Sequence, residues 1–318
     1  MNSSRLAIAM DIGGTNLRFA LINESAVILK KGATLTSDHE GKDAIIQRII
    51  DSARLVLEWA EAQPVAMGLA LASPVDPDTG IMHMPPNILS LQGYSPIHDL
   101  KTNLGMPVVA ANDATLAALA EHRYGLKKSV DNLVYLTLST GVGGGQIING
   151  EIYNGSRGFA AEWGHLTLDL DGPQCNCGSN GCFETFCSGP SIVRITHELL
   201  KETGADSTLR QGDLEKLTPL NIAQAAREGD QFSLTVWNKI GRYLGIALSV
   251  ILNTLDPEII IIGGGVSSAL DLMLESVKRE INVRALFPYV DKIPIRSAQL
   301  GDEAGLIGAA TLAFDNVT

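Results

Sequence analysis

The chain has 318 residues, of which 45% are hydrophobic and 5% are aromatic. A chain of this length is too long for one ordinary hydrophobic core, so we expect two lobes. Its 32 glycines suit a loop-rich α/β enzyme better than an all-β shell. The chain has 35 Asp and Glu residues against 24 Lys and Arg residues, so its formal net charge is −11. This charge disfavours nucleic acid and anionic membranes as partners. The apolar stretches are too short for a signal peptide or a membrane span, so we expect a soluble cytoplasmic protein.

The first part of the chain predicts a three-stranded meander followed by alternating helices and strands. Period-two alternation on both sides of Gly13 and Gly14 indicates a hairpin, and helical spacing marks the longer apolar segments. Strands are expected at residues 6–12, 16–22, 27–35, 65–71 and 106–112, and helices at residues 41–62 and from Asp113 onward.

The second part opens like the first, because residues 132–150 again give a strand, a polar residue, a glycine turn and a strand. Further helices are expected at residues 190–203, 232–255, up to Arg284 and from Asp302, and further strands at residues 258–265 and 293–297. The repetition predicts a duplicated α/β unit with a cleft between two lobes. We expect a small lobe of residues 1–111 and a large lobe of residues 112–301, with a closing helix at residues 302–318 that packs back on the first lobe.

Two glycine turns indicate phosphate binding. "DIGGT" (residues 11–15) fits a hairpin whose backbone N–H groups converge on an anion, with positive φ angles at the glycines, although a plain type I′ or II′ hairpin is the alternative. "STGVGGG" (residues 139–145) occupies the equivalent turn of the second half. Neither turn matches the Walker or the Rossmann pattern, which disfavours those two nucleotide folds. "GGGV" (residues 263–266) would let a flat nucleoside approach the backbone closely.

All four cysteines lie within 13 residues, between Cys175 and Cys187. His165, Cys175, Cys177 and Cys182 supply one imidazole and three thiolates, which suits a closed tetrahedral zinc site, with buried free thiols as the alternative. A disulfide is disfavoured in a reducing compartment. Cys187 is surplus to four ligands and is expected to be an ordinary buried cysteine. Because four protein ligands leave no open position for water, such a zinc ion would be structural.

Two carboxylates flank the expected zinc ligands. Glu162 precedes His165 by three residues and Glu184 follows Cys182 by two, so both are expected beside the metal. A histidine that uses one nitrogen for zinc can offer its other N–H to a ligand hydroxyl. Two carboxylates with a fixed imidazole suit a neutral, polyhydroxylated substrate. The alternative for either glutamate is a solvated surface carboxylate.

The combination of "DIGGT", "EWGH" and "CNCGSNGCFE" at these positions resembles the ROK family of repressors, open-reading-frame proteins and sugar kinases, within the hexokinase and actin-like ATPase superfamily. The resemblance covers essentially the whole chain and, within the family, is greatest to bacterial glucokinases. It implies a two-lobed, duplicated ribonuclease H-like (actin-like ATPase) fold with a cleft between the lobes and a zinc knuckle in the second lobe. It also implies a homodimer or homotetramer.

The resemblance implies that Asp113, in "AANDAT", is the catalytic base. It would accept the proton of a sugar hydroxyl as that oxygen attacks the γ-phosphoryl group of ATP, with Mg2+ bridging the phosphates. A strand-to-helix junction favours an ionised Asp, although a simple helix cap is the alternative. By the same resemblance, the sugar is bound by Asn87, Asn112, Asp113, Glu162, His165 and Glu184, the phosphates by Asp11, Gly13, Gly14, Thr15, Thr140 and Gly141, and adenosine by Gly263, Gly264 and Gly265.

The implied activity is ATP-dependent phosphorylation of the 6-hydroxyl of glucose. Kinases for N-acetylmannosamine, N-acetylglucosamine, allose or fructose are alternatives, as is polyphosphate as the donor. A further alternative is a sugar-sensing regulator, but such proteins carry a helix-turn-helix before the first phosphate strand, and a strand that begins by Leu6 leaves no room for one. Two positions depart from the family pattern: Ser73 replaces a common glycine before Pro74, and Ser139 begins the second turn where glycine is frequent.

Overall fold

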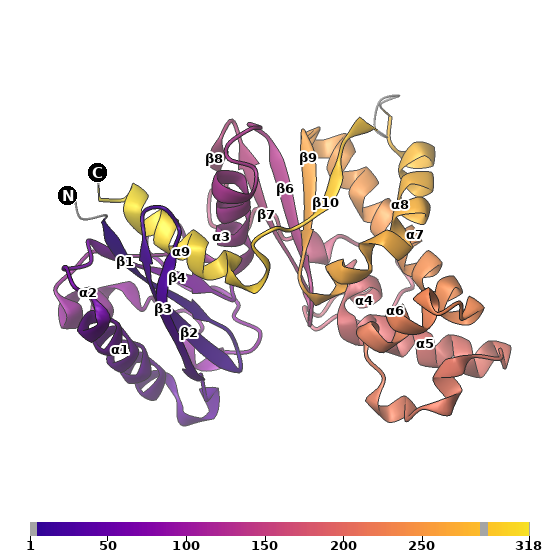
Figure 1. Ribbon diagram of the computed structural model, residues 1–318, viewed down its shortest axis with the longest axis horizontal. Helices are drawn as coiled ribbons and strands as arrows, with labels where there is room; N and C mark the ends of the chain where they lie inside the picture. The colour runs from indigo at the N-terminus through magenta and orange to yellow at the C-terminus, as the bar shows by residue number, and fades with distance from the viewer. Residues whose placement is uncertain (1–4, 287–291, 318) are drawn as a thin grey trace. The chain divides into compact units, whose positions relative to one another are not determined.

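A computed structural model describes residues 5–286 and 292–317, which form two five-stranded sheets with helices against them (Figure 1). The strands are β1 Leu6–Ile12, β2 Asn16–Asn23, β3 Ile28–Leu35, β4 Ala66–Leu71, β5 Val108–Asn112, β6 Leu133–Leu138, β7 Val142–Ile148, β8 Glu151–Ile152, β9 Ile259–Gly263 and β10 Ile295–Ser297. The helices are α1 Lys42–Trp59, α2 Ile97–Leu104, α3 Asp113–Ala120, α4 Glu184–Cys187, α5 Gly189–Thr203, α6 Pro219–Arg227, α7 Gln231–Leu255, α8 Leu270–Arg284 and α9 Ala304–Asp315. Each strand and helix expected from the sequence is present, whereas α2, α4, α6 and β8 were not expected.

The chain divides into two compact units. The first comprises Met1–Asp131, Gly145–Ala161 and Gln299–Thr318, and the second comprises Asn132–Gly144 and Glu162–Ala298. These units differ from the predicted lobes because α3 and the segment after Gly144 group with the N-terminal residues. The predicted closing helix is α9 within the described residues, and residue 318 at its expected end lies outside them.

The first sheet has the strand order β3-β2-β1-β4-β5, with β1 antiparallel to β2 and parallel to β4. Alternation along β1 separates its two faces: Ile8, Met10 and Ile12 belong to a core shared with α1, whereas Ala7 and Ala9 belong to a core shared with α9. In Figure 1, α1 and α9 cover opposite faces of this sheet. The large side chains therefore fill one face, and the small ones let a helix lie close to the other.

Glycines bring α9 close to its neighbours. A Cβ atom on Gly68 of β4 would lie 1.9 Å from the carbonyl oxygen of Ala309, and one on Gly308 would lie 2.0 Å from the carbonyl oxygen of Leu116 on α3. No side chain fits at either position without moving the backbone. These contacts fix α9 against both the first sheet and α3, the helix that begins at Asp113.

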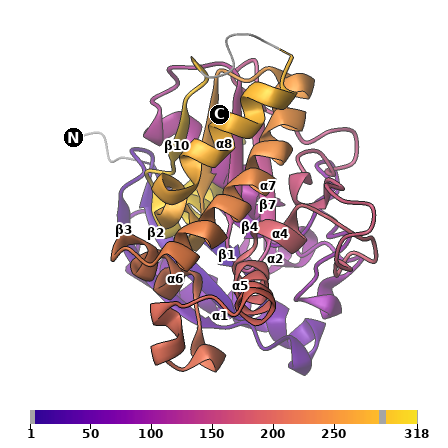
Figure 2. The ribbon, with the colours of Figure 1, turned by 90° about the vertical axis from the view of Figure 1, so that its right-hand side faces the viewer.

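The second sheet has the strand order β10-β9-β6-β7-β8, with β9 parallel to both β6 and β10. Written from β8, this order places β6 and β9 where β1 and β4 stand in the first sheet. Figure 2 shows α7 and α8 lying along each other, and they share a core that includes the fully buried Trp237. Among the described residues, no helix combines the length and the hydropathy that crossing a bilayer requires.

An ion-pair cluster joins α7 to α8. Glu280 on α8 accepts from Arg242 on α7 at 3.0 Å and from Arg284 at 2.9 Å, and only 10% of its side chain is exposed. Burial raises the pKa of Glu280, but the hydrogen bonds and charges of Arg284 and Arg242 outweigh burial and hold this pKa below its ordinary value. The ionised carboxylate therefore stabilises the folded state above its unfolded pKa, and this contribution is lost as the pH falls through the lower folded pKa.

We expect Glu280→Gln to lower the free energy of unfolding by about 1 kcal/mol at neutral pH, with the loss shrinking below about pH 4. Urea unfolding at several pH values measures this difference. Glu275→Gln, at an exposed position of the same helix, is the matched control and should have little effect at any pH. A Glu280→Gln deficit of equal size at pH 7 and at about pH 3 would contradict this role.

Candidate active site

The first glycine turn connects β1 to β2 in the first unit. The N–H of Gly13 donates to the carbonyl of Asn16 at 3.0 Å, and the hydroxyl of Thr36 donates to the carbonyl of Gly13 at 2.6 Å. Neither Gly13 nor Gly14 has the positive φ expected from the sequence. Glycine is required at position 14 because a Cβ atom there would lie 2.3 Å from the Cβ of Asn87, which leaves no space for a side chain. The turn thus contacts a residue expected to bind sugar.

Asp11 lies near the end of β1, just before this turn, and only 7% of the residue is exposed. Its carboxylate accepts a hydrogen bond from Arg18, which also donates to the carbonyl of Asp302 at 2.8 Å. Burial raises the pKa of Asp11 above its ordinary value, and the charge and hydrogen bond of Arg18 offset part of that rise. Arg18 therefore connects the strands beside the expected phosphate turn to the segment that leads into α9. Thr15, the last residue of this turn, is exposed.

Asn112 and Asp113 stand where β5 meets α3. Asn112 caps the helix, since its side-chain oxygen accepts the N–H of Thr115 at 3.0 Å. Asp113 is the first helical residue, and its Oδ1 accepts the N–H of Ala114 at 2.8 Å. The capping role belongs to Asn112, so the alternative of Asp113 as the cap is wrong. A carboxylate in the first turn of a helix is favoured in its ionised form by the helix dipole.

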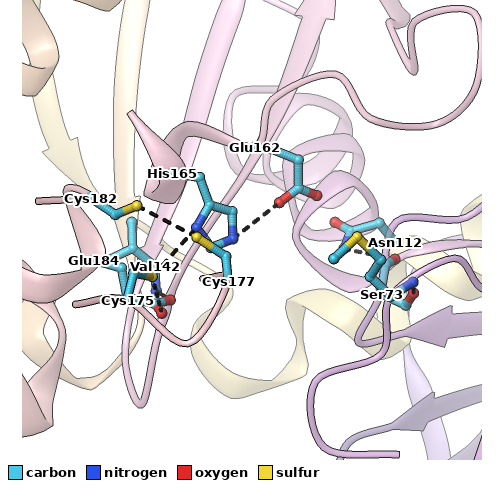
Figure 3. Close-up of polar contacts among 10 residues, drawn as sticks. Ser73, Asn112, Val142, Glu162, His165, Cys175, Cys177, Cys182 and Glu184 are labelled. Atoms are coloured by element: carbon cyan, nitrogen blue, oxygen red, sulfur yellow. Dashed lines mark hydrogen bonds and ion pairs between the residues drawn. The ribbon is translucent and has the colours of Figure 1, made fainter. Parts of the chain in front are cut away.

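Ser73, one of the departures from the family pattern, is buried with 2% exposed. Its hydroxyl donates to the carbonyl of Pro74 at 2.9 Å and accepts the N–H of Met84 at 3.3 Å. Its carbonyl accepts from the side-chain nitrogen of Asn112 at 3.2 Å (Figure 3). The serine hydroxyl is thus satisfied within its own loop, and the backbone of this loop orients Asn112.

His165, Cys175, Cys177 and Cys182 form one cluster in the second unit (Figure 3), with ligand atoms that all lie within 4.8 Å of one another. The Sγ atoms of Cys177 and Cys182 are 3.6 Å apart, and the Sγ of Cys175 is 3.8 Å from the Nδ1 of His165. A tetrahedral zinc ion with bonds of about 2.3 Å requires sulfur–sulfur distances of about 3.8 Å, whereas a disulfide requires about 2.05 Å. The donor set and its spacing therefore fit a metal ion. Cys187 is buried in the core and donates to the carbonyl of Ile240.

The other side of the His165 ring faces Glu162. The Nε2 of His165 lies 3.9 Å from a carboxylate oxygen of Glu162, while Nδ1 is on the side of Cys175 (Figure 3). Burial raises the pKa of Glu162, the neighbouring His165 lowers it, and the charge of Glu184 raises it further, with a net rise. A ring N–H and a carboxylate at this separation can donate to and accept from the hydroxyls of one ligand.

Glu184, the first residue of α4, connects the metal cluster to the second glycine turn. Its Oε2 accepts the N–H of Val142 at 2.8 Å, and its Oε1 is 3.9 Å from the Sγ of Cys175 (Figure 3). A Cβ atom on Gly141 would lie 2.5 Å from the same Oε2, so the glycine leaves room for the carboxylate. No pattern in the sequence indicated the Val142 contact, because a backbone N–H is present at every residue except proline.

The third glycine segment follows β9. Gly264 has a φ of 78° and a Cβ atom on it would lie 2.3 Å from the carbonyl oxygen of Leu138, the last residue of β6. A Cβ on Gly263 would lie 2.1 Å from the hydroxyl of Tyr135. Gly265 is exposed, with nothing within 4 Å of a Cβ position. This segment thus lies beside the end of β6, where the turn with Thr140 and Gly141 begins.

The expected site residues fall into two groups. In the first unit, the turn at Gly13–Thr15 meets Asn87, and Asn112 adjoins Asp113. In the second unit, the metal cluster contacts Glu162 and Glu184, and Glu184 reaches the second glycine turn. Each group combines a glycine turn with residues expected to bind sugar.

Comparisons with known proteins agree with the motifs. The ROK family model matches residues 7–316. The chain is 35% identical over 318 residues to the glucokinase of Halalkalibacterium halodurans, covering 98% of this chain and 95% of that protein. A crystal structure of a ROK family glucokinase from Streptomyces griseus, in complex with glucose and AMPPNP, superposes with a TM-score of 0.83 at 32% identity, covering 98% of this chain and 99% of that one.

A regulator also matches. The xylose repressor of Caldicellulosiruptor bescii is 26% identical over 313 residues, which are 98% of this chain and 78% of the repressor. The same family thus includes kinases and regulators with a common core. With a family model that extends from residue 7 to residue 316 and glucokinase relatives matched over nearly their whole length, this chain belongs to the ROK family.

Proposed function

We propose that this protein is an ATP-dependent kinase that transfers the γ-phosphoryl group of ATP to the 6-hydroxyl of glucose. The observation that carries the proposal is the 32% identity, across nearly both whole chains, to a ROK glucokinase that binds glucose and AMPPNP together. The geometry supports it, because each unit combines residues suited to sugar hydroxyls with a glycine turn suited to phosphate.

Glucose is neutral, so its recognition depends on paired hydrogen bonds to hydroxyls. We assign these bonds to Glu162, His165 and Glu184 in the second unit and to Asn87, Asn112 and Asp113 in the first. The Nε2 of His165 and the carboxylate of Glu162 are 3.9 Å apart, which provides a donor and an acceptor for neighbouring hydroxyls. The raised pKa of Glu162 reflects a partly desolvated carboxylate, and such a group gains most from ligand hydroxyl donors.

Asp113 acts as the base. Its carboxylate accepts the proton of the glucose 6-hydroxyl as that oxygen forms a bond to the γ-phosphorus, and the bond from this phosphorus to the bridging oxygen of ADP breaks in line. The position of Asp113 at the N-terminus of α3 supports an ionised carboxylate that is ready to take the proton. Asn112 holds the start of α3 in place by capping it.

The nucleotide phosphates are assigned to the two glycine turns, namely to Gly13, Gly14 and Thr15 and to Thr140 and Gly141. Backbone N–H groups at such turns stabilise phosphate oxygens. Adenosine is assigned to Gly263, Gly264 and Gly265. Gly264 packs against the end of β6, and Gly265 leaves open space after β9. Asp11 offers the carboxylate oxygen that Mg2+ prefers and would hold it through water, since Arg18 occupies one oxygen. When bound, Mg2+ neutralises charge on the transferring phosphoryl group.

His165, Cys175, Cys177 and Cys182 would hold a structural zinc ion. Their one-nitrogen, three-sulfur donor set is closed and fits the observed distances. Zinc would supply a cross-link between the segment at His165 and the turn at Cys175–Cys182, which fixes the ring of His165 for the sugar.

The equivalent strand orders of the two sheets support a duplicated, ribonuclease H-like fold, the architecture of actin-like ATPases. We further propose lobes of residues 1–111 and 112–301 with a cleft between them. We also propose a homodimer or homotetramer that works in the cytoplasm. The net charge of −11 supports the absence of a nucleic-acid partner.

The second candidate is a sugar-sensing regulator without catalysis, which the similarity to a xylose repressor favours. Release of ADP from Mg-ATP distinguishes the two. We would assay the purified protein with glucose, mannose, fructose, allose, N-acetylglucosamine and N-acetylmannosamine, and repeat the glucose reaction with polyphosphate in place of ATP. We expect the highest kcat/KM for glucose with ATP. Turnover of another sugar would show that the protein is a kinase with a different substrate. Binding of glucose without turnover would favour the regulator.

A further inference from the structure

The second glycine turn is held mainly by its backbone. Ser139 and Thr140, at the start of the turn, are exposed. The N–H of Ser139 donates to the carbonyl of Gly141 at 2.9 Å within the turn, and the N–H of Gly189 donates to the carbonyl of Ser139 at 2.7 Å. At its other end, the N–H of Val142 donates to the carboxylate of Glu184 at 2.8 Å. This last bond is the charge-assisted one.

Val142 is also contacted from the opposite side by the segment that carries His165. A Cβ atom on Gly164 would lie 2.0 Å from the carbonyl oxygen of Val142, so this glycine presses directly on the backbone of the turn. The residues on both sides of Gly164 belong to the motif "EWGH". Val142 thus lies between the metal-ligand segment, which packs on its carbonyl, and Glu184, which accepts its N–H.

Glu184 is itself fixed by the cluster. The N–H of Phe183 donates to the carbonyl of Leu166 at 2.7 Å, which joins the residue after Cys182 to the residue after His165. The hydroxyl of Ser191 donates to the carbonyl of Glu184 at 2.9 Å. Because its backbone is held within two residues of a metal ligand, the carboxylate has a defined position from which to hold Val142.

We propose that Glu184 is a positioning residue that holds the nucleotide phosphate turn in place and couples it to the metal cluster. The inference rests on the proposed function, in which this turn binds phosphate. A carboxylate beside a phosphate site costs electrostatic repulsion, so its presence requires a compensating role, and the bond to Val142 supplies one. The bond occupies the N–H of Val142, so we assign phosphate binding to the N–H groups of Thr140 and Gly141 rather than to that of Val142.

The test separates this role from sugar binding by omitting the sugar. Isothermal titration calorimetry with Mg-AMPPNP alone should show about tenfold weaker binding for Glu184→Ala than for the wild type, the effect expected when a hydrogen bond to a charged group is lost. Glu184→Gln should stay within about threefold of the wild type, because its amide oxygen can still accept the N–H of Val142.

Glu162→Ala is the matched control. Glu162 is expected to contact sugar, and its carboxylate pairs with His165 and makes no hydrogen bond to the turn in the described part of the chain. Its loss should therefore weaken glucose binding and leave AMPPNP binding unchanged. In steady state, Glu184→Ala should raise the KM for ATP at saturating glucose, and Glu162→Ala should raise only the KM for glucose. Metal content and thermal unfolding of each variant confirm that the cluster and the fold are intact.

Gly141→Ala provides a second route if Glu184→Ala fails to fold, because its Cβ would displace the carboxylate oxygen that lies 2.5 Å away. We expect Gly141→Ala to weaken AMPPNP binding. The double variant that combines Glu184→Ala with Gly141→Ala should bind AMPPNP no more weakly than whichever single variant binds it less tightly. Wild-type affinity for AMPPNP in Glu184→Ala, or losses of affinity that multiply in the double variant, would overturn this inference and leave the proposed function standing. A wild-type protein that binds no AMPPNP would overturn the proposed function as well.

Discussion

Asp113→Asn is expected to lower kcat by about 10²- to 10⁴-fold, the range for loss of a general base. The amide keeps the shape of the side chain but cannot accept the proton of the glucose 6-hydroxyl. The fold should survive, because Asn112 rather than Asp113 caps α3. Glucose should bind within a few-fold of the wild-type affinity, because an amide can still hydrogen-bond the hydroxyl.

Rates of ADP release and calorimetric glucose affinity measure the two halves of this prediction. Asp271→Asn is the matched control, since Asp271 also lies in the first turn of a helix but pairs with Arg227 at an exposed position. Its kcat should not change. An Asp113→Asn enzyme that turns over near the wild-type rate would show that another group takes the proton.

Cys182→Ser is expected to abolish metal binding and to lower the free energy of unfolding by more than about 4 kcal/mol, the range in which loss of a structural metal falls. Cys182 is fully buried, and a serine hydroxyl cannot replace a thiolate as a zinc ligand. Without the metal, the segments at His165 and Cys175 lose their cross-link. Glucose and AMPPNP should both bind more weakly, because His165 and Glu184 depend on that cross-link for their positions.

Metal analysis and thermal unfolding measure these effects. Cys187→Ser is the control, because Cys187 is equally buried but lies outside the four-residue cluster, so this variant should keep a full complement of zinc. A Cys182→Ser protein that keeps its metal would exclude the proposed ligand set. Loss of the metal with unchanged stability and binding would show that the metal does not support the site.

Local patterns accounted for most of the elements. Alternation on both sides of a glycine pair predicted the β1–β2 hairpin, and the long apolar helix α7 was recognisable from its spacing. The helix α6 was missed although its signals are present, since Thr218 and Asn221 form a capping box and Pro219 occupies the first turn. The predicted reason for Gly14 was wrong, because the glycine provides space beside Asn87 rather than a positive φ.

The site was predictable where residue type alone carries the chemistry. Three cysteines and a histidine within 18 residues of one another can be recognised as a metal site from the sequence, and the structure brings these four side chains together. The bond from Val142 to Glu184 was not predictable, because it joins residues 42 apart and one partner is a backbone N–H. Such contacts depend on the packing of whole elements, as do those of Gly164 and Gly68 with distant carbonyl groups.

The most direct test of the central claim is to identify the product by ³¹P nuclear magnetic resonance after incubation of the purified protein with Mg-ATP and glucose. We predict ADP and a sugar phosphate whose phosphorus couples to the two protons of C6, in equal amounts. No sugar phosphate, or a phosphate on another carbon, would contradict the proposed kinase reaction.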